Sequence, residues 1–196
     1  MKNKINVLFM SLALISTTVQ TMAQEKTKKV KSFTVSKVMD LPADKVWAVV
    51  GEDYGAIAAS HPKVVSSNYI GGTLHAGEGA ERVCNFNESG TKFLREVMQE
   101  YDPENMTFIN QVTQADKFPM DPDVTRAIYK VEDLGNGKTR FTFDMQFRTK
   151  PAFMGAMAKG KFKGLIEDYF IAIEHHIRTG ETVTKENFKE IKKLYS

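Results

Sequence analysis

The sequence predicts an α+β domain in which several antiparallel strands precede one long C-terminal helix. Apolar and polar residues alternate from 139 to 149, which is the period of a half-buried strand. Apolar residues recur at intervals of three and four from 162 to 177, which is the period of an amphipathic helix. Between residues 64 and 149, turns containing glycine or proline separate short β-branched and aromatic runs, as antiparallel strands require.

A first strand and two short helices are expected before these elements. Phe33, Val35 and Val38 alternate with polar residues over 32–39 and predict the strand. The segment 41–44, which contains Pro42, ends that strand and begins a helix, because proline fits the first turn of a helix but interrupts a strand ladder. A second short helix is expected over 54–59, ending near His61.

The remaining strands are bounded by turn signals. Ser89-Gly90 predicts a two-residue hairpin turn, and the segment 135–137 predicts another hairpin. The expected strand ranges are 64–70, 81–87, 91–101, 106–112, 124–131 and 139–149.

The long helix is expected to end near Gly180, which suits a helix C-terminus. Its first half contains Gly155, Gly160 and Gly164. Because each glycine costs roughly 1 kcal/mol of helix stability relative to alanine, that half should be the looser one. A C-terminal tail, residues 181–196, is expected to add a small helix with Phe188, Ile191 and Leu194 at helical spacing.

Residues 1–23 are interpreted as a secretory signal peptide. Lys2 and Lys4 precede an apolar run over 5–15, and Ala23 suits cleavage before residue 24. That run is too short for a bilayer core, which needs about 20 residues. We therefore expect a periplasmic or secreted protein with no stable membrane span after signal removal, a retained membrane anchor being the alternative. A polar lead-in over 24–31 and a domain over 32–180 follow.

Composition excludes several classes of function. The 27 Lys and Arg residues against 24 Asp and Glu give a net charge of +3, too small an excess to indicate a nucleic-acid partner. The single cysteine, Cys84, cannot form an internal disulfide, and the four histidines lack metal-ligand spacing. No metal or cofactor is therefore expected. Cys84 is interpreted as a buried hydrophobe, with a reactive or intermolecularly paired thiol as the alternative. The oligomeric state stays open.

From about residue 32 to 178, the order of elements resembles the START-like (SRPBCC) superfamily, which includes polyketide cyclase/dehydrase and lipid-transport proteins. The segments that carry this resemblance are Leu41-Pro42-Ala43-Asp44-Lys45-Val46-Trp47, Gly77-x-Gly79-x-x-Arg82, Arg95-Glu96-Val97-x-x-x-Tyr101-Asp102-Pro103 and Gly135-Asn136-Gly137-Lys138-Thr139-x-Phe141. The resemblance implies a helix-grip fold, in which a curved antiparallel sheet of six to seven strands wraps around the long helix and leaves a cavity between them.

The resemblance implies a small hydrophobic ligand in that cavity. Residues 24–196 contain seven methionines and twelve phenylalanines, side chains that suit adaptable apolar surfaces, although they would equally suit a filled core. The leading hypothesis is an exported protein that binds a lipid, polyketide-like or aromatic molecule. The alternative is a polyketide cyclase/dehydratase-like enzyme that uses acid–base catalysis in the same cavity. A third reading is an envelope protein that binds a partner through its tail, around Phe188 and Leu194.

Three residues are candidates for acid–base chemistry. Arg82 and Glu96 fall on neighbouring strands, and counting outward from Ser89-Gly90 places Arg82 opposite position 97, one step from Glu96. They form either an ion pair on the outer face of the sheet or a buried acid or base in the cavity. His61 precedes the second strand, where it is either an exposed loop residue or a proton shuttle that titrates near neutrality.

Six further residues are candidates for ligand contacts. Asn110 and Tyr129 could orient a carbonyl or enol by hydrogen bonding, and Tyr54, next to a glycine, could gate the cavity mouth. Methionines and a phenylalanine at the start of the long helix could supply apolar surface. These three are Met154, Met157 and Phe162.

Overall fold

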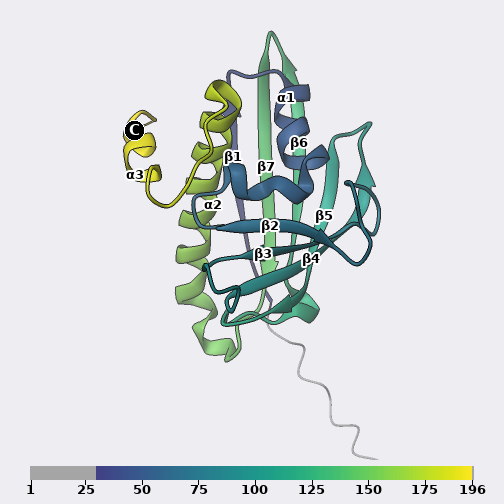
Figure 1. Ribbon diagram of the computed structural model, residues 1–196, viewed down its shortest axis with the longest axis vertical. Helices are drawn as coiled ribbons and strands as arrows, with labels where there is room; N and C mark the ends of the chain where they lie inside the picture. Colours follow the sequence, from purple (N-terminus) through teal and green to yellow (C-terminus); the bar gives the residue numbers. More distant parts are fainter. Residues whose placement is uncertain (1–29, 196) are drawn as a thin grey trace, which may run out of the picture.

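Seven strands form one antiparallel sheet, and a long helix lies beside it in the computed structural model, which describes residues 30–195 (Figure 1). The sheet order is β1-β7-β6-β5-β4-β3-β2. In Figure 1, β2, β3 and β4 run across the direction of β1 and β7, so the sheet is strongly twisted and curved. The strands are β1 (Lys31–Met39), β2 (Ser66–Ile70), β3 (Glu81–Asn85), β4 (Phe93–Asp102), β5 (Thr107–Ala115), β6 (Arg126–Gly135) and β7 (Lys138–Phe147).

Helical segments follow β1 and β7, as the sequence predicts. α1 continues directly into the π-helical turn η1, and a 3₁₀ segment, η2, follows it and ends immediately before His61. The helical elements are α1 (Ala43–Trp47), η1 (Ala48–Glu52), η2 (Tyr54–Ser60), η3 (Pro122–Val124), η4 (Ala152–Met154), α2 (Gly155–Thr179) and α3 (Phe188–Lys193). This arrangement confirms the predicted α+β helix-grip fold.

The core lies between the inner face of the sheet and α2. On β7, alternate side chains point inward, and Phe141 and Phe147 are fully buried. The Phe141 ring stacks on Phe170 of α2 with ring centroids 4.5 Å apart. This contact packs an inward-facing residue of β7 against the apolar stripe of α2. Aromatic pairs of this kind add stability beyond their buried area.

The hairpin between β3 and β4 differs from the sequence prediction. Its loop spans 86–92, in which the Phe86 amide donates to the Lys92 carbonyl over 2.8 Å and Gly90 adopts a φ of 63°. An odd number of loop residues shifts the register by one position from that of a two-residue turn. Arg82 therefore lies directly opposite Glu96 rather than opposite position 97.

α2 ends as the sequence predicts. Gly180 adopts a left-handed φ of 73°, and its amide donates to the His176 carbonyl over 2.8 Å, which satisfies a carbonyl at the helix end. The tail then folds back over η2 and packs α3 against α2. Phe188 is buried within the chain itself, so it is not available to a partner, whereas Leu194 is 74% exposed.

No helix within residues 30–195 is long and apolar enough to cross a bilayer. The expected signal peptide over 1–23, and the lead-in up to residue 29, lie outside the described residues.

Candidate functional site

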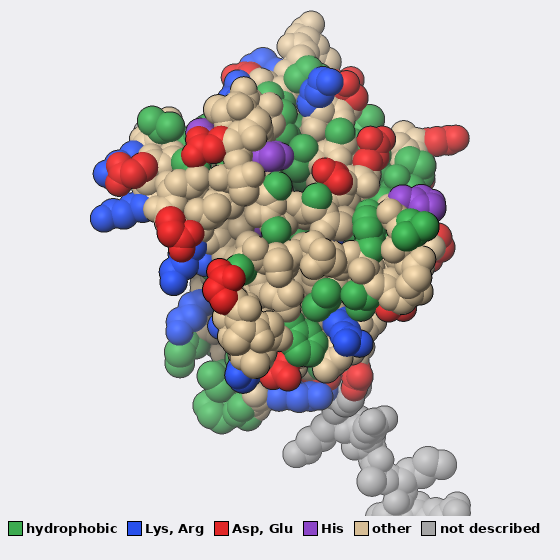
Figure 2. Space-filling view, viewed as in Figure 1, with side chains coloured by type: hydrophobic (Ala, Val, Ile, Leu, Met, Phe, Trp, Pro, Cys, Tyr) green, Lys and Arg blue, Asp and Glu red, His purple; other side chains and the backbone are tan. Residues whose placement is uncertain are grey.

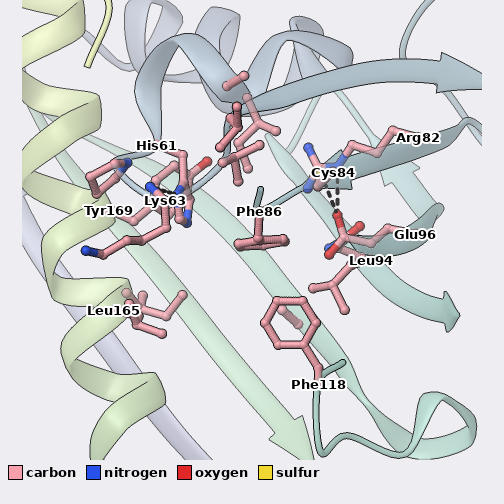
Figure 3. Close-up of a pocket in the computed structure, with 18 of the residues that line it drawn as sticks. His61, Lys63, Arg82, Cys84, Phe86, Leu94, Glu96, Phe118, Leu165 and Tyr169 are labelled. Atoms are coloured by element: carbon pink, nitrogen blue, oxygen red, sulfur yellow. Dashed lines mark hydrogen bonds and ion pairs between the residues drawn. The ribbon is translucent and has the colours of Figure 1, made fainter. Parts of the chain in front are cut away.

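A cavity of about 890 Å³ lies between α2 and the inner face of the sheet. This volume falls within the range of small-molecule sites, roughly 300–1,000 Å³. Figure 3 shows Tyr169 and Leu165 of α2 on one side of the cavity and Phe86, Leu94 and Phe118 across from them. The walls are mostly apolar and include aromatic side chains from the sheet and from the helix.

A buried ion pair lies in the wall formed by β3 and β4. Arg82 Nε donates to Glu96 Oε2 over 2.8 Å, and the two residues are 3% and 8% exposed. The alternation of both strands explains their burial, because Cys84 and Leu94, two positions away on the same strands, also point inward. The outer-face alternative for this pair is therefore wrong.

The pair belongs to a closed network of hydrogen bonds. Arg82 Nη1 donates to the Tyr54 carbonyl over 2.7 Å, and the Tyr54 hydroxyl donates to Asn110 Oδ1 over 2.6 Å. Asn110 Nδ2 then donates to Glu96 Oε1 over 2.8 Å. The guanidinium of Arg82 also lies 3.8 Å from the centre of the Tyr54 ring, a favourable cation–π contact. Tyr54 therefore anchors the network from η2.

The charges of the network cancel. Burial is the largest influence and opposes the charge of Arg82, but the Glu96 carboxylate, together with Cys84, Tyr54 and Tyr129, raises the pKa of Arg82 well above its usual range. The guanidinium thus stays charged and paired. Burial also raises the pKa of Tyr129 and of Tyr169, both of which line the cavity. Their hydroxyls stay protonated and can donate hydrogen bonds.

His61 lines the cavity at the end of η2 and is only 9% exposed. Its ring packs against Tyr169 with centroids 4.8 Å apart, and its Nδ1 accepts a hydrogen bond from the Lys63 amide over 3.0 Å. Burial lowers the pKa of His61 to about 3, and the positive charge of Arg82 acts in the same direction. The imidazole is therefore neutral near pH 7, and the prediction that it titrates near neutrality is wrong.

Cys84 is buried on β3, two positions after Arg82. Its thiol donates to Glu96 Oε2 over 3.5 Å, and burial raises the pKa of Cys84 to about 12. Because the thiolate is the reactive form of cysteine, this placement supports the interpretation of Cys84 as a buried hydrophobe and not the reactive alternative.

The structure brings most of the candidate residues together. Arg82, Glu96, His61, Asn110, Tyr129 and Phe162 all line the cavity. Tyr54 is 1% exposed and lies behind Arg82, so it supports the site instead of gating its mouth.

Met154 of η4 and Met157 of α2 are not among the lining residues, because η4 and the first turns of α2 lie beyond the cavity, and Met157 points outward with 66% exposure. The methionines that line the cavity are instead Met120 and Met145. Met145 could have been found from the sequence, because it shares the inward period of β7 with Phe141 and Phe143. Tyr169 could have been found in the same way, because it lies on the apolar stripe of α2 together with Phe162.

The histidines near the end of α2 make contacts of another kind. His175 Nε2 lies 2.9 Å from Glu181 Oε2, and His176 Nδ1 lies 2.8 Å from the Glu181 carbonyl oxygen. Both histidines therefore fix Glu181, at the start of the tail, to the end of α2. Among residues 30–195, no cluster of three or more His, Cys, Asp or Glu residues could hold a metal ion.

The curved sheet, the long helix and the lined cavity define a ligand-binding helix-grip protein. The chain belongs to the family described as polyketide cyclase/dehydrase and lipid transport, whose model matches residues 31–172. No curated protein matches the chain.

Solved structures share the fold. A protein of Thermobifida fusca is 24% identical with a TM-score of 0.61, covering 74% of this chain and 92% of its own. An uncharacterised protein of Bacillus thuringiensis is 16% identical with a TM-score of 0.58, and the match covers 75% of this chain and 98% of that protein. The protein Ara h 8.0201 is 17% identical with a TM-score of 0.55, and the match covers 77% of this chain and 99% of that protein.

Proposed function

We propose that this protein is an exported carrier that binds one small, mainly hydrophobic molecule with a neutral polar group in its internal cavity. The observation that carries the proposal is an apolar cavity of about 890 Å³ whose buried polar cluster has no net charge. Lipid-like, polyketide-like and aromatic molecules fall within this class.

Burial of apolar ligand surface supplies the driving force. At about 30 Å³ per molecule in liquid water, the cavity has room for roughly 30 waters. Apolar walls such as those of Leu94, Val112 and Phe143 offer such waters few hydrogen bonds. Replacing them with a hydrophobic molecule gains about 25 cal/mol for each Å² of apolar surface removed from water.

The ion pair selects a neutral polar group. A buried ligand carboxylate would compete with Glu96 for Arg82 and leave one carboxylate unpaired, which costs several kcal/mol. A ligand ammonium would compete with Arg82 for Glu96 in the same way. A carbonyl or hydroxyl can instead accept a hydrogen bond from the protonated hydroxyl of Tyr129 or Tyr169 without disturbing the pair.

Export forms part of this proposal and is supported by the sequence of residues 1–23. Cell fractionation with determination of the mature N-terminus tests it. A chain that begins at residue 24 and is recovered outside the cytoplasm is expected, and an uncleaved cytoplasmic chain would contradict it.

Thermal shifts with matched ligands test the ligand class. A long-chain alcohol and a methyl ketone should stabilise the protein more than the fatty acid or the amine of equal chain length. The discrimination should weaken in Tyr129→Phe, which removes only the hydroxyl. Equal stabilisation by the fatty acid would contradict a site built for neutral groups. An absence of any shift across the series would contradict the carrier itself.

A cyclase/dehydratase is the second candidate, because Arg82, Glu96 and Tyr129 line one cavity and could exchange protons with a bound polyketide. Against it, Arg82, Asn110 and Cys84 all donate to Glu96, and His61 is neutral. Turnover of a polyketide substrate that is lost in Tyr129→Phe, with the fold retained, would favour this candidate over the carrier.

A further inference from the structure

An exposed apolar and basic surface lies over the beginning of α2. Phe153 of η4 is 83% exposed and Met157 is 66% exposed. Three exposed lysines follow them on the same helix: Lys159, Lys161 and Lys163. We name these five residues the α2 surface. Figure 2 shows hydrophobic and basic side chains side by side at the lower left, over the lower end of α2.

Helical geometry sets which of these side chains share one outward face. Met157, Gly160 and Gly164 recur at intervals of three and four, so they share one outward face. A Cβ atom on Gly160 or Gly164 would meet no atom within 4 Å, so neither glycine makes room for another described part of the chain. At about 100° per residue, Lys161 lies beside this face, Lys163 lies about 120° round the helix from Met157, and Lys159 lies about 160° from it. Lys161 and Lys163 therefore flank the face on its two sides, and Lys159 lies farther round the helix.

The charge around the α2 surface is mainly positive. From residue 145 to residue 166 the sequence contains no Asp or Glu. Lys163 lies 3.7 Å from Glu167, and within residues 30–195 no ion pair is formed by Lys159 or Lys161. The neighbouring Lys150 forms an ion pair with the buried Asp121, with 3.0 Å between Nζ and Oδ1. The positive charge of the α2 surface is therefore largely uncompensated.

We propose that the α2 surface docks the protein on the anionic surface of a lipid bilayer, with Phe153 and Met157 inserted between headgroups. Stable peripheral binding needs two signals, an apolar insertion and a basic cluster, and this surface has both. Lysine stems also lie along apolar surface while their charges reach lipid phosphates. A protein partner would be expected to bury about 800 Å² around several apolar anchors, whereas this surface offers two.

Docking does not depend on what the cavity binds. Phe153, Met157 and the three lysines lie outside the cavity lining, so their replacement should leave ligand binding unchanged. The two proposals can therefore fail separately.

Fluorescence of the full chain with an environment-sensitive dye at Ala156→Cys tests the proposal locally. Ala156 is exposed beside Met157, and the buried Cys84 thiol should stay unlabelled in the native protein. The control carries the dye at Leu74→Cys. Leu74 is an apolar residue that is 86% exposed on the turn after β2, but its neighbours in the sequence include Glu78 and no lysine cluster. The probes are vesicles of phosphatidylcholine alone and of an equimolar mixture with phosphatidylglycerol.

A blue shift is expected for the dye at residue 156, only with the anionic vesicles, and no shift for the dye at residue 74. Replacing the three lysines with glutamine should weaken vesicle affinity at least roughly twenty-five-fold, since each lysine near an anionic surface contributes about fivefold and Lys161 and Lys163 flank the inserted face. Phe153→Ala with Met157→Ala should weaken it at least about tenfold. The matched Leu74→Ala variant should bind as the wild type does.

Three results would overturn the proposal. The first is an unshifted dye at residue 156 with anionic vesicles, which would leave the α2 surface to a protein partner. The second is an equal shift with both kinds of vesicle. The third is full affinity of the lysine variant. Because every replaced side chain is exposed, circular dichroism should show a native fold in all variants.

Discussion

Replacing Glu96 with glutamine removes the negative charge from the buried pair and keeps the size of the side chain. Arg82 is 3% exposed and holds Glu96 across 2.8 Å. At an effective dielectric constant of about 20, two unit charges at this distance attract by roughly 6 kcal/mol. Part of this attraction offsets the desolvation of both ions. Breaking such a buried pair costs about 3–5 kcal/mol, because one charge stays buried without a partner.

The sheet provides a matched control. Glu132 and Arg140 also lie directly opposite each other on antiparallel strands, 3.0 Å apart, but both side chains are 44% exposed. Glu132→Gln should therefore cost at most about 1 kcal/mol. The register and the replacement are the same for the two variants, but Glu96 also accepts hydrogen bonds from Asn110 and Cys84. The difference between the variants therefore measures the burial of the pair together with these two hydrogen bonds.

Urea unfolding at neutral pH is the assay. With a slope of about 2 kcal/mol per molar urea, Glu96→Gln should lower the midpoint by roughly 1.5–2.5 M, and Glu132→Gln by about 0.5 M or less. Equal losses for the two variants would refute the reasoning, because they would show that the Arg82–Glu96 pair behaves as a solvated ion pair.

Three further predictions follow from single residues. The unfolded chain protonates His61 below about pH 6.5 but the folded chain only near pH 3, so stability is complete above pH 6.5 and falls by about 1.4 kcal/mol per pH unit below it. Relative to His61→Phe, wild type should lose stability in this window, and parallel pH profiles would contradict the burial of a neutral imidazole. Cys84 should react with a thiol reagent only after unfolding, since burial raises its pKa to about 12; rapid labelling of the native protein would contradict this placement. Gly160→Ala should stabilise the protein by about 1 kcal/mol. Gly51→Ala should instead destabilise it by about 1–3 kcal/mol, because a Cβ there would lie 2.7 Å from the Trp47 ring. Thermal melts in which Gly51→Ala is the more stable variant would contradict this account of the two glycines.

The fold could be predicted because its signals are local. The period of two in β7 and the apolar stripe of α2 both follow from neighbouring residues, and Gly180 marks the helix end by its own backbone freedom. The register of β3 and β4 could not be predicted in the same way. It depends on the loop 86–92, where the Asn87 side chain accepts a hydrogen bond from the Lys92 amide over 3.0 Å and stabilises a longer turn than Ser89-Gly90 suggests.

The site was partly accessible from the sequence. Inward burial of Arg82 and Glu96 could have been inferred from Cys84, Leu94 and Met98, apolar residues two positions away on the same strands. The environment of His61 could not be inferred, because it depends on Tyr169, more than a hundred residues later in the chain. The sequence also could not show which face of the first turns of α2 is directed toward the sheet, since apolar residues lie on both faces of the helix there.

Native mass spectrometry of the protein purified from its own host tests the central claim most directly. The cavity should carry one hydrophobic molecule per chain, seen as a discrete mass adduct that organic extraction releases. Ala127→Trp should abolish the adduct, because Ala127 is buried and points from β6 into the cavity. A chain that carries no adduct when freshly isolated, or an adduct that persists unchanged in folded Ala127→Trp, would contradict an internal binding site.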